Sequence, residues 1–242
     1  STAPLLLPAH ASLATGCDPN ISHRFTPAGQ PQTLERGWQI PRAAPHLAVE
    51  FLANSLAPDY HDQMSLEIFG TTVQHQVDLT ELVVDVPARL NAMQAHHYDG
   101  DTNIGGGLRE GRLSLTGAGA RPNASKVLVL LSDGVATAWE SLSPPSPDGV
   151  VTANHSTQGN EGNEAVARAY VIQQAEWARD AGVQVFAVNI GTVADADLMI
   201  EVAEITNGRF FQVVGNTIAE RQTRLLAVFE EIAISRPVTL VQ

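Results

Sequence analysis

The sequence has few of the residues on which several classes of protein depend. Cys17 is the only cysteine among 242 residues, so the chain can form no internal disulfide, no cysteine-based zinc site and no dithiol redox centre. Only 14 residues are basic against 26 acidic ones, which gives a formal net charge of −12. This charge repels phosphate backbones and favours cations or basic protein surfaces, so we expect no nucleic acid among the partners.

Long hydrophobic runs and internal repeats are missing as well. No run reaches the roughly 18 apolar residues of a membrane-spanning helix, and residues 1–15 lack the basic start and the long apolar stretch of a signal peptide. We therefore expect a soluble chain with no transmembrane segment. A hydrophobic content of 44% is enough for one sizeable core, and a solenoid is excluded because no period of about 20 to 50 residues is visible.

The chain divides by composition into an arm, a domain and a tail. Residues 1–41 contain six prolines and little periodicity, which predicts an extended arm or insertion. Residues 42–235 form the expected domain, and residues 236–242 a C-terminal tail. Within the domain, residues 136–163 are rich in Pro, Ser, Asn and Gly and are too long for a simple connection, so we expect an exposed inserted loop.

Strand and helix patterns alternate along the domain. The run KVLVLL at 126–131 is continuously apolar after its lysine, which is typical of a strand buried on both faces of a parallel sheet. Further strands are expected at 64–69, 71–79, 183–190 and 210–214, and helices at 42–57, 80–96, 105–115, 165–181, 196–205 and 218–232. This order predicts an α/β fold with a Rossmann-like, doubly wound, mostly parallel sheet, one antiparallel edge strand and helices on both faces.

Two loops carry the candidate chemistry, GDTNIGGGL at 100–108 and LSDG at 131–134. In doubly wound sheets, ligands bind at the carboxyl ends of the strands. A dinucleotide-binding loop would directly follow a buried strand, whereas Gln94 to Tyr98 precede the first of these loops. A serine hydrolase would have Gly-x-Ser-x-Gly, and LLSDG lacks the first glycine. Neither enzyme class is favoured.

The order of the motifs resembles the von Willebrand factor type A (vWA) family over about residues 42–235. GDTNIGGGLREG, KVLVLLSDG, VQVFAVNIG and ITNGRFFQV follow one another and look most like the bacterial versions attached to tight-adherence pilus proteins and other exported assemblies. That family builds a metal-ion-dependent adhesion site (MIDAS) from Asp-x-Ser-x-Ser after the first strand, a Thr in a Gly-rich loop and an Asp after the fourth strand. The resemblance implies that Thr102 and Asp133 contact the ion, while Asp101 and Asn103 shape the loop.

The cofactor implied by the resemblance is Mg²⁺, or Mn²⁺ or Ca²⁺ in its place. Mg²⁺ takes about six hard oxygen ligands in octahedral geometry. Hydroxyls, carboxylates and waters supply some of them, and a Glu or Asp of a protein partner can complete the shell. Binding of this kind needs no covalent chemistry, so we expect no catalytic residue.

The first strand of the family and its metal loop are not evident in the sequence. Asp18-Pro19-Asn20-Ile21-Ser22 gives Asp-x-Asn-x-Ser, but residues 9–16 before it form a poor pattern for a central strand and Pro8 interrupts a longer one. A sheet without its central strand would leave the backbone of two neighbours unpaired. We therefore expect the natural polypeptide to extend upstream of Ser1 and to carry the missing strand and its Asp-x-Ser-x-Ser loop there.

The resemblance implies a non-enzymatic adhesion or protein-binding module of a cell-surface or exported assembly, at an extracellular or periplasmic location. Two alternatives stay open. One is a metal-free structural scaffold subunit, recognisable by an apolar outer patch. The other is a hydrolase or phosphoryl-transfer enzyme that uses Asp133, which would need a second catalytic group converging on that carboxylate.

Overall fold

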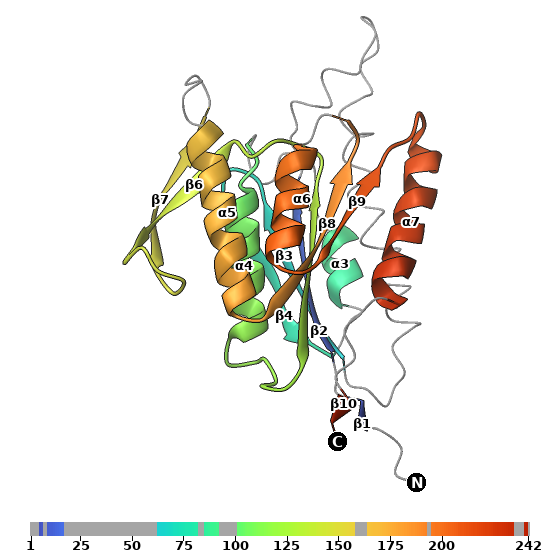
Figure 1. The fold of residues 1–242 in the computed structure, drawn as a ribbon, viewed down its shortest axis with the longest axis horizontal. Helices are drawn as coiled ribbons and strands as arrows, with labels where there is room; N and C mark the ends of the chain where they lie inside the picture. The colour runs from blue at the N-terminus through green and yellow to red at the C-terminus, as the bar shows by residue number, and fades with distance from the viewer. Residues whose placement is uncertain are drawn as a thin grey trace, which may run out of the picture.

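A computed structural model of the chain describes residues 5–6, 9–16, 62–81, 85–91, 101–157, 164–192, 195–234 and 240–241. Its centre is a six-stranded sheet with the order β4-β3-β2-β5-β8-β9 (Figure 1). The strands are Val73–Thr80 (β4), Gln63–Phe69 (β3), Ala9–Gly16 (β2), Ser125–Ser132 (β5), Val183–Ile190 (β8) and Arg209–Val213 (β9). Neighbours run parallel except β3 and β4. The predicted fold class, with one antiparallel edge strand, is confirmed.

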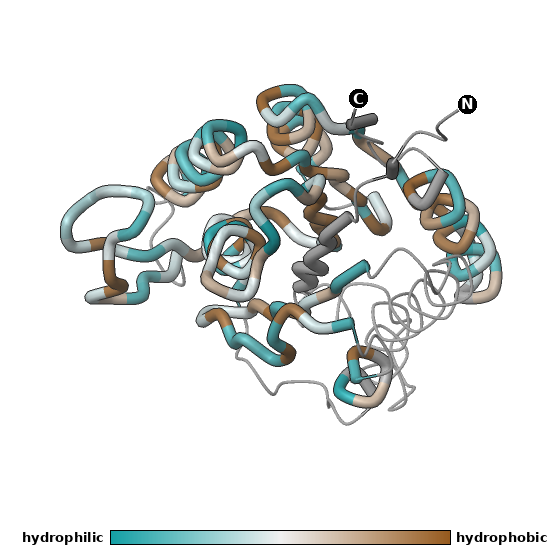
Figure 2. The backbone as a smooth tube through the Cα atoms, turned by 90° about the horizontal axis from the view of Figure 1, so that it is seen from below, coloured by the Kyte–Doolittle hydropathy of each residue, from teal (hydrophilic) through white to brown (hydrophobic). Residues whose placement is uncertain are grey.

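Helices cover both faces of this sheet. Val127, Val129 and Leu131 of β5 belong to a core cluster with side chains of α3 (Asp85–Asn91) and α7 (Ile218–Ile234). Leu128 and Leu130 belong to a second cluster with α4 (Ile104–Thr116), α5 (Glu164–Asp180) and α6 (Ala196–Ile205). Alternate side chains of a strand point to opposite faces, so β5 is buried on both, as its apolar run predicts. Figure 2 shows each helix with hydrophobic and hydrophilic residues around its axis. The helix expected at 42–57 lies outside the described residues.

The central strand of the sheet is β2, and our expectation that this strand lies upstream of Ser1 is wrong. β2 pairs in parallel with β3, from His10 opposite Gln63 to Gly16 opposite Phe69, and with β5 on its other side. Pro8 does not interrupt it, because the strand begins after the proline, where a missing N–H costs the ladder nothing. The backbone of β3 and β5 thus finds its partner within the residues expected to form only an arm.

The inserted segment 136–163 contains a β-hairpin. β6 (Ala138–Ser143) and β7 (Val150–Ser156) pair antiparallel as a separate two-stranded sheet beside α5 (Figure 1). The turn of the hairpin is bonded to α4, because the buried Arg109 donates from Nη2 to the Gly149 carbonyl at 2.8 Å and Arg112 donates to the Pro147 carbonyl. The insertion is therefore attached to the domain at its far end as well as at its base.

The two ends of the described chain meet. β1 (Leu5–Leu6) pairs antiparallel with β10 (Leu240–Val241). These short strands come from the segments expected to form the arm and the tail. None of the helices in the described ranges is both long and apolar enough to span a membrane.

Candidate cation site

Three adjacent strands end at the same level of the sheet. Phe69 at the end of β3 pairs with Gly16 at the end of β2, and Gly16 pairs on its other side with Ser132 at the end of β5. Because these strands are parallel, their carboxyl ends form one edge, which is where ligands of doubly wound sheets bind. The loop that contains Thr102 is bonded to residues beside this edge, and Asp133 directly follows β5.

The loop that contains Thr102 is held between the β3 and β5 ends of this edge. The Asn103 N–H donates to the carbonyl of Gly70, the residue after β3, at 2.9 Å. The Thr102 N–H donates to Thr137 Oγ1 at 2.9 Å, and the Thr102 carbonyl accepts from the Thr137 N–H at 3.0 Å. Since Thr137 follows β5 by five residues, Thr102 is fixed beside the carboxyl end of β2, the strand between β3 and β5.

Thr102 is fully buried, and its hydroxyl has no hydrogen-bond partner among the described residues. Its side chain is 0% exposed, and Oγ1 has no hydrogen-bond partner within the part of the chain that the structure describes. Leaving a buried hydroxyl unpaired costs roughly 1 to 3 kcal/mol, and each such group in a native structure calls for an explanation. A hydroxyl oxygen that is kept for a cation would account for it, which fits the role that the sequence predicts for Thr102.

Asp133 stands at the same edge. It follows Ser132, the last residue of β5, and is half-buried. Ser132 Oγ accepts from the Gly134 N–H at 3.4 Å, so a bond between the residues on either side of Asp133 closes a tight turn around it. Asp133 and the Thr102 loop therefore both lie at the edge formed by the carboxyl ends of β3, β2 and β5. Within the described residues, no cluster of three or more His, Cys, Asp and Glu side chains has metal-binding geometry, so the candidate ligands here are hydroxyl and carboxylate oxygens from separate loops.

Asp101 and Asn103 are occupied by hydrogen bonds within the protein. Asp101 Oδ2 accepts from Ser156 Oγ at 2.5 Å and from Thr71 Oγ1 at 3.4 Å. Asn103 is the N-cap of α4, and its Oδ1 accepts from the Gly106 N–H at 2.8 Å. An N-cap of this kind stabilises the first turn of a helix by roughly 1 kcal/mol. Both side chains therefore hold the loop on either side of Thr102.

Two residues beside this loop were missed at the level of sequence. Glu140 of β6 is only 6% exposed and accepts from the Tyr170 hydroxyl at 2.8 Å and from Asn103 Nδ2 at 3.4 Å. Burial raises the pKa of Glu140, and the Tyr170 bond and the Arg109 charge oppose that shift. Because residues 136–163 were expected to form an inserted loop, no strand pattern pointed to Glu140, which shares the buried face of β6 with Ala138.

The three glycines in the first turn of α4, Gly105 to Gly107, leave no room for a side chain. A Cβ on Gly105 would lie 2.3 Å from Tyr170 Cδ1, so the glycine allows the ring of α5 to touch the helix backbone. The glycines of GDTNIGGGL thus belong to a tightly packed helix start. This packing fixes Tyr170 where its hydroxyl reaches Glu140.

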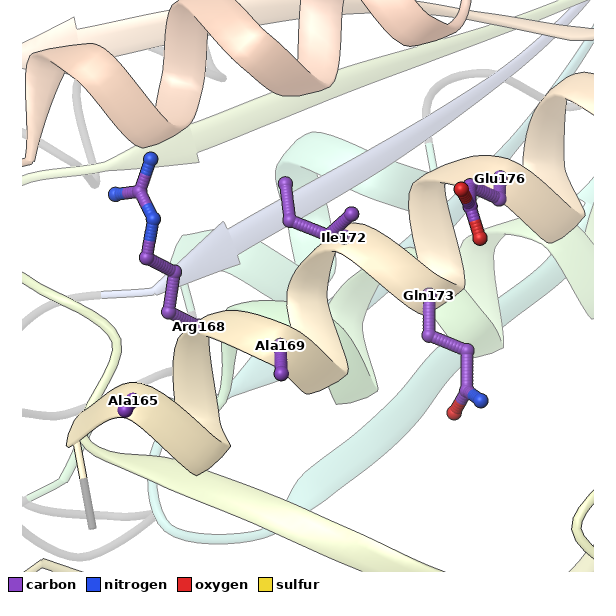
Figure 3. A pocket seen from close by; sticks show the side chains of 6 residues that line it. All are labelled: Ala165, Arg168, Ala169, Ile172, Gln173 and Glu176. Carbon is purple, nitrogen blue, oxygen red and sulfur yellow. The ribbon is translucent and has the colours of Figure 1, made fainter.

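A separate open hollow of about 370 Å³ lies on α5. Its lining comes from Ala165, Arg168, Ala169, Ile172, Gln173 and Glu176 (Figure 3). Arg168 is engaged in ion pairs with Asp195 and Glu201, each at 2.7 Å. This arginine links α5 to α6, and the hollow adds no group to the edge where Thr102 and Asp133 lie.

Comparison with known proteins supports the resemblance. Residues 46–221, more than half of the chain, match the von Willebrand factor type A domain. The match begins after β2, so the first strand is seen in the structure and not in the sequence match. No match was found among the curated proteins.

Solved structures share the fold at low sequence identity. The PilB minor pilin from Streptococcus sanguinis is 16% identical with a TM-score of 0.65, and the alignment covers 98% of this chain and 65% of that one. The vWF domain of the type V pili tip protein Mfa5 from Porphyromonas gingivalis is 14% identical with a TM-score of 0.69, covering 98% and 99%. Proximal thread matrix protein 1 from the mussel byssus, with a zinc-occupied MIDAS motif, is 17% identical with a TM-score of 0.60, covering 96% and 48%.

The chain thus spans 65% of the pilin and less than half of the byssus protein, whereas it spans almost the whole Mfa5 domain. At these identities the structural matches establish the fold alone. The family match over 46–221, the strand order and the position of the Thr102 and Asp133 loops agree with one another. The chain belongs to the von Willebrand factor type A domain family.

Proposed function

We propose that this domain is a non-enzymatic adhesion module that binds a protein partner through a divalent cation, as part of a cell-surface or exported assembly. The observation that carries the proposal is the buried Thr102 hydroxyl, unpartnered among the described residues at the carboxyl edge of β2 and β5. Two of the structural neighbours are a minor pilin and a pilus tip protein, and a third has a zinc-occupied MIDAS motif. These neighbours support an extracellular or periplasmic location.

Thr102 and Asp133 are the proposed direct ligands, one through a hydroxyl and the other through a carboxylate. The position of β2 adds a third source of oxygens, because Asp18-Pro19-Asn20-Ile21-Ser22 follows the last residue of β2 after Cys17 alone. These five residues are not among those that the structure describes. We include Asp18, Asn20 and Ser22 in the proposed site because the strand that precedes them is the central one, as in the Asp-x-Ser-x-Ser loop of the family.

A cation is the means by which this acidic chain would hold an acidic partner. The net charge of −12 repels a carboxylate, and two like charges about 4 Å apart interact unfavourably by roughly 1 kcal/mol even in water. A divalent ion between them supplies attraction to both, and oxygen ligands on Thr102 and Asp133 suit Mg²⁺, Mn²⁺ or Ca²⁺. The partner is therefore proposed to be a protein that presents a Glu or Asp side chain.

The test is calorimetric titration of the full chain with Mg²⁺, Mn²⁺ and Ca²⁺. Asp133→Asn should weaken Mg²⁺ binding by about a hundredfold, because a coordinating charge is lost, a loss of about 2.7 kcal/mol. Asp180→Asn is the matched control, since it makes the same charge change on an exposed residue at the end of α5 and should leave the affinity unchanged. Asp18→Asn tests the first loop in the same way.

Thr102→Val separates a ligand from a structural hydroxyl. Valine keeps the shape and removes the unpaired oxygen, so the metal-free protein should be as stable as the parent or more stable, while Mg²⁺ affinity falls. A parent chain that binds none of the three cations would overturn the proposal and leave a metal-free scaffold. Equal Mg²⁺ affinity of the parent and Asp133→Asn would exclude the assigned ligand.

A further inference from the structure

A buried carboxylate beside the candidate cation site has no role in the site as described so far. Glu140 accepts from Tyr170 at 2.8 Å and from Asn103 Nδ2 at 3.4 Å. Asn103 follows Thr102 directly and caps α4. The carboxylate is therefore bonded to the neighbour of a proposed ligand, and a buried charge is tolerated only when such donors surround it.

The hairpin that carries Glu140 is bonded to three consecutive residues of the loop. Ser156 at the end of β7 donates to Asp101 Oδ2 at 2.5 Å. Thr137, just before β6, exchanges backbone and side-chain bonds with Thr102, and Glu140 on β6 bonds Asn103. Movement of the hairpin cannot leave the Thr102 loop unchanged.

We propose that Glu140 is a positioning residue of the cation site, which fixes the loop presenting Thr102 through its bonds to Asn103 and Tyr170. This inference rests on the proposed function. It makes the β6–β7 hairpin part of the cation site even though it supplies none of the proposed ligands. A partner that contacts the hairpin then changes cation affinity, and the cation changes partner affinity by the same factor, because coupling between two binding sites is reciprocal.

The polarity of the Glu140 bonds explains why the residue is an acid. Asn103 Nδ2 can only donate, and the Tyr170 hydroxyl donates here as well, so a carboxylate with two accepting oxygens satisfies both at once. A glutamine has one acceptor and one donor end, so Glu140→Gln either sets its amide against the amide of Asn103 or forces the Tyr170 hydroxyl to accept instead of donate, and in both cases a bond to the carboxylate charge is lost. Residues 101–103 are then held less firmly, although the side chain at position 140 keeps its size.

The first measurement compares Mg²⁺ affinity of the parent, Glu140→Gln and a control by titration calorimetry. We expect Glu140→Gln to bind Mg²⁺ about tenfold more weakly, which is the effect of about 1.4 kcal/mol. Glu110→Gln makes the same charge change on α4, where the ion pair of Glu110 within the described residues goes to Arg109 and not to Asn103. Its affinity should stay within about twofold of the parent, because none of the bonds that hold residues 101–103 is lost.

The second measurement is a rescue by reversed polarity. Asn103→Asp combined with Glu140→Gln turns the bond around: the new amide donates to the new carboxylate, and its oxygen still accepts from Tyr170. Aspartate is as good an N-cap as asparagine, so α4 keeps its cap and the net charge is unchanged. We expect the double variant to regain Mg²⁺ affinity to within about threefold of the parent, since both bonds are restored.

The outcomes are decisive in either direction. Unchanged Mg²⁺ affinity in Glu140→Gln, or a loss that the double variant does not restore, would overturn the positioning role. If the parent binds no cation, the proposed function fails, and amide hydrogen exchange over residues 101–108 then decides this inference alone. Exchange should be faster in Glu140→Gln and normal again in the double variant, and equal exchange in all three proteins would reject the role.

Discussion

Two buried glutamates, Glu67 on β3 and Glu140 on β6, stand in different surroundings. Each accepts a hydrogen bond from a hydroxyl on a helix: Ser114 at 2.6 Å for Glu67 and Tyr170 at 2.8 Å for Glu140. Burial is the largest influence on both and raises both pKa values. The two groups therefore face the same difficulty of a carboxylate removed from water.

They differ in the second partner. Glu67 accepts from His75 Nδ1 at 2.9 Å, and His75, whose side chain is 41% exposed, also bonds the exposed Asp78. The second partner of Glu140 is the amide of Asn103, which is itself 0% exposed and cannot titrate. The Glu67 cluster can adjust its charge with pH, whereas the Glu140 cluster must keep its geometry. We therefore expect changes of shape to act on Glu140 and changes of pH to act on Glu67.

The largest effect should come from a change of shape beside Glu140. In Gly105→Ala the added Cβ would meet Tyr170 Cδ1 at 2.3 Å, so the ring or the helix must move, at a cost of about 2 to 3 kcal/mol for overpacking. Urea unfolding should show this loss, and Mg²⁺ binding should weaken with it because Tyr170 and Asn103 share Glu140. Gly119→Ala is the control, since a Cβ there meets nothing within 4 Å. Equal stability of the two variants would contradict the close packing of α4 and α5.

The next effect compares the two hydroxyls directly. Tyr170→Phe leaves the Glu140 carboxylate with the longer bond from Asn103, so we expect a loss of about 2 kcal/mol, in the range for hydrogen bonds to charged groups. Ser114→Ala leaves Glu67 with two contacts from His75 at 2.9 and 3.1 Å, so a loss of about 1 kcal/mol is expected. Denaturant unfolding at neutral pH measures both. A cost for Ser114→Ala equal to or above that for Tyr170→Phe would break the comparison.

The strands show how far sequence alone reaches. KVLVLL predicts β5 because a strand buried on both faces leaves an unbroken apolar run. AHASLATG, the sequence of β2, has no such run, and its place is fixed by backbone pairing with β3 and β5, whose residues lie more than 50 and 110 positions away. Local propensity does not contain that pairing. The missing first strand of the sequence-based interpretation was therefore a strand with a weak local pattern.

The candidate site likewise contains residues that the sequence singles out and residues that only tertiary packing brings together. Thr102 and Asp133 stand in two contiguous motifs, so the sequence alone singles them out as candidate ligands. Glu140 and Tyr170 lie 30 residues apart and meet only because the hairpin packs against α4 and α5. Their contact depends on the tertiary packing of an insertion. The sequence marks this insertion only as a long polar segment.

The smallest effect should be the pH dependence of the Glu67 cluster. Burial lowers the pKa of His75, but the charge and hydrogen bonds of Glu67, and then those of Asp78, outweigh it and leave the His75 pKa raised above 6.5. A raised folded-state pKa means that stability from this group is fully present below about pH 6.5 and is lost as pH rises through the folded value. Glu67 has the same sign, with the loss beginning above about pH 4.5.

We therefore expect the parent to lose stability as pH rises above about 6.5, by about 0.5 kcal/mol because His75 is partly exposed and such pairs contribute less than about 1 kcal/mol. Glu67→Gln removes the Glu67 titration and the largest influence that raises the pKa of His75, so it should flatten this slope in urea unfolding. Glu81→Gln makes the same charge change on a residue that pairs with Arg121 and should keep the slope of the parent. If Glu67→Gln retains the slope, the pH dependence comes from another group, and the distinction between the two glutamates does not hold.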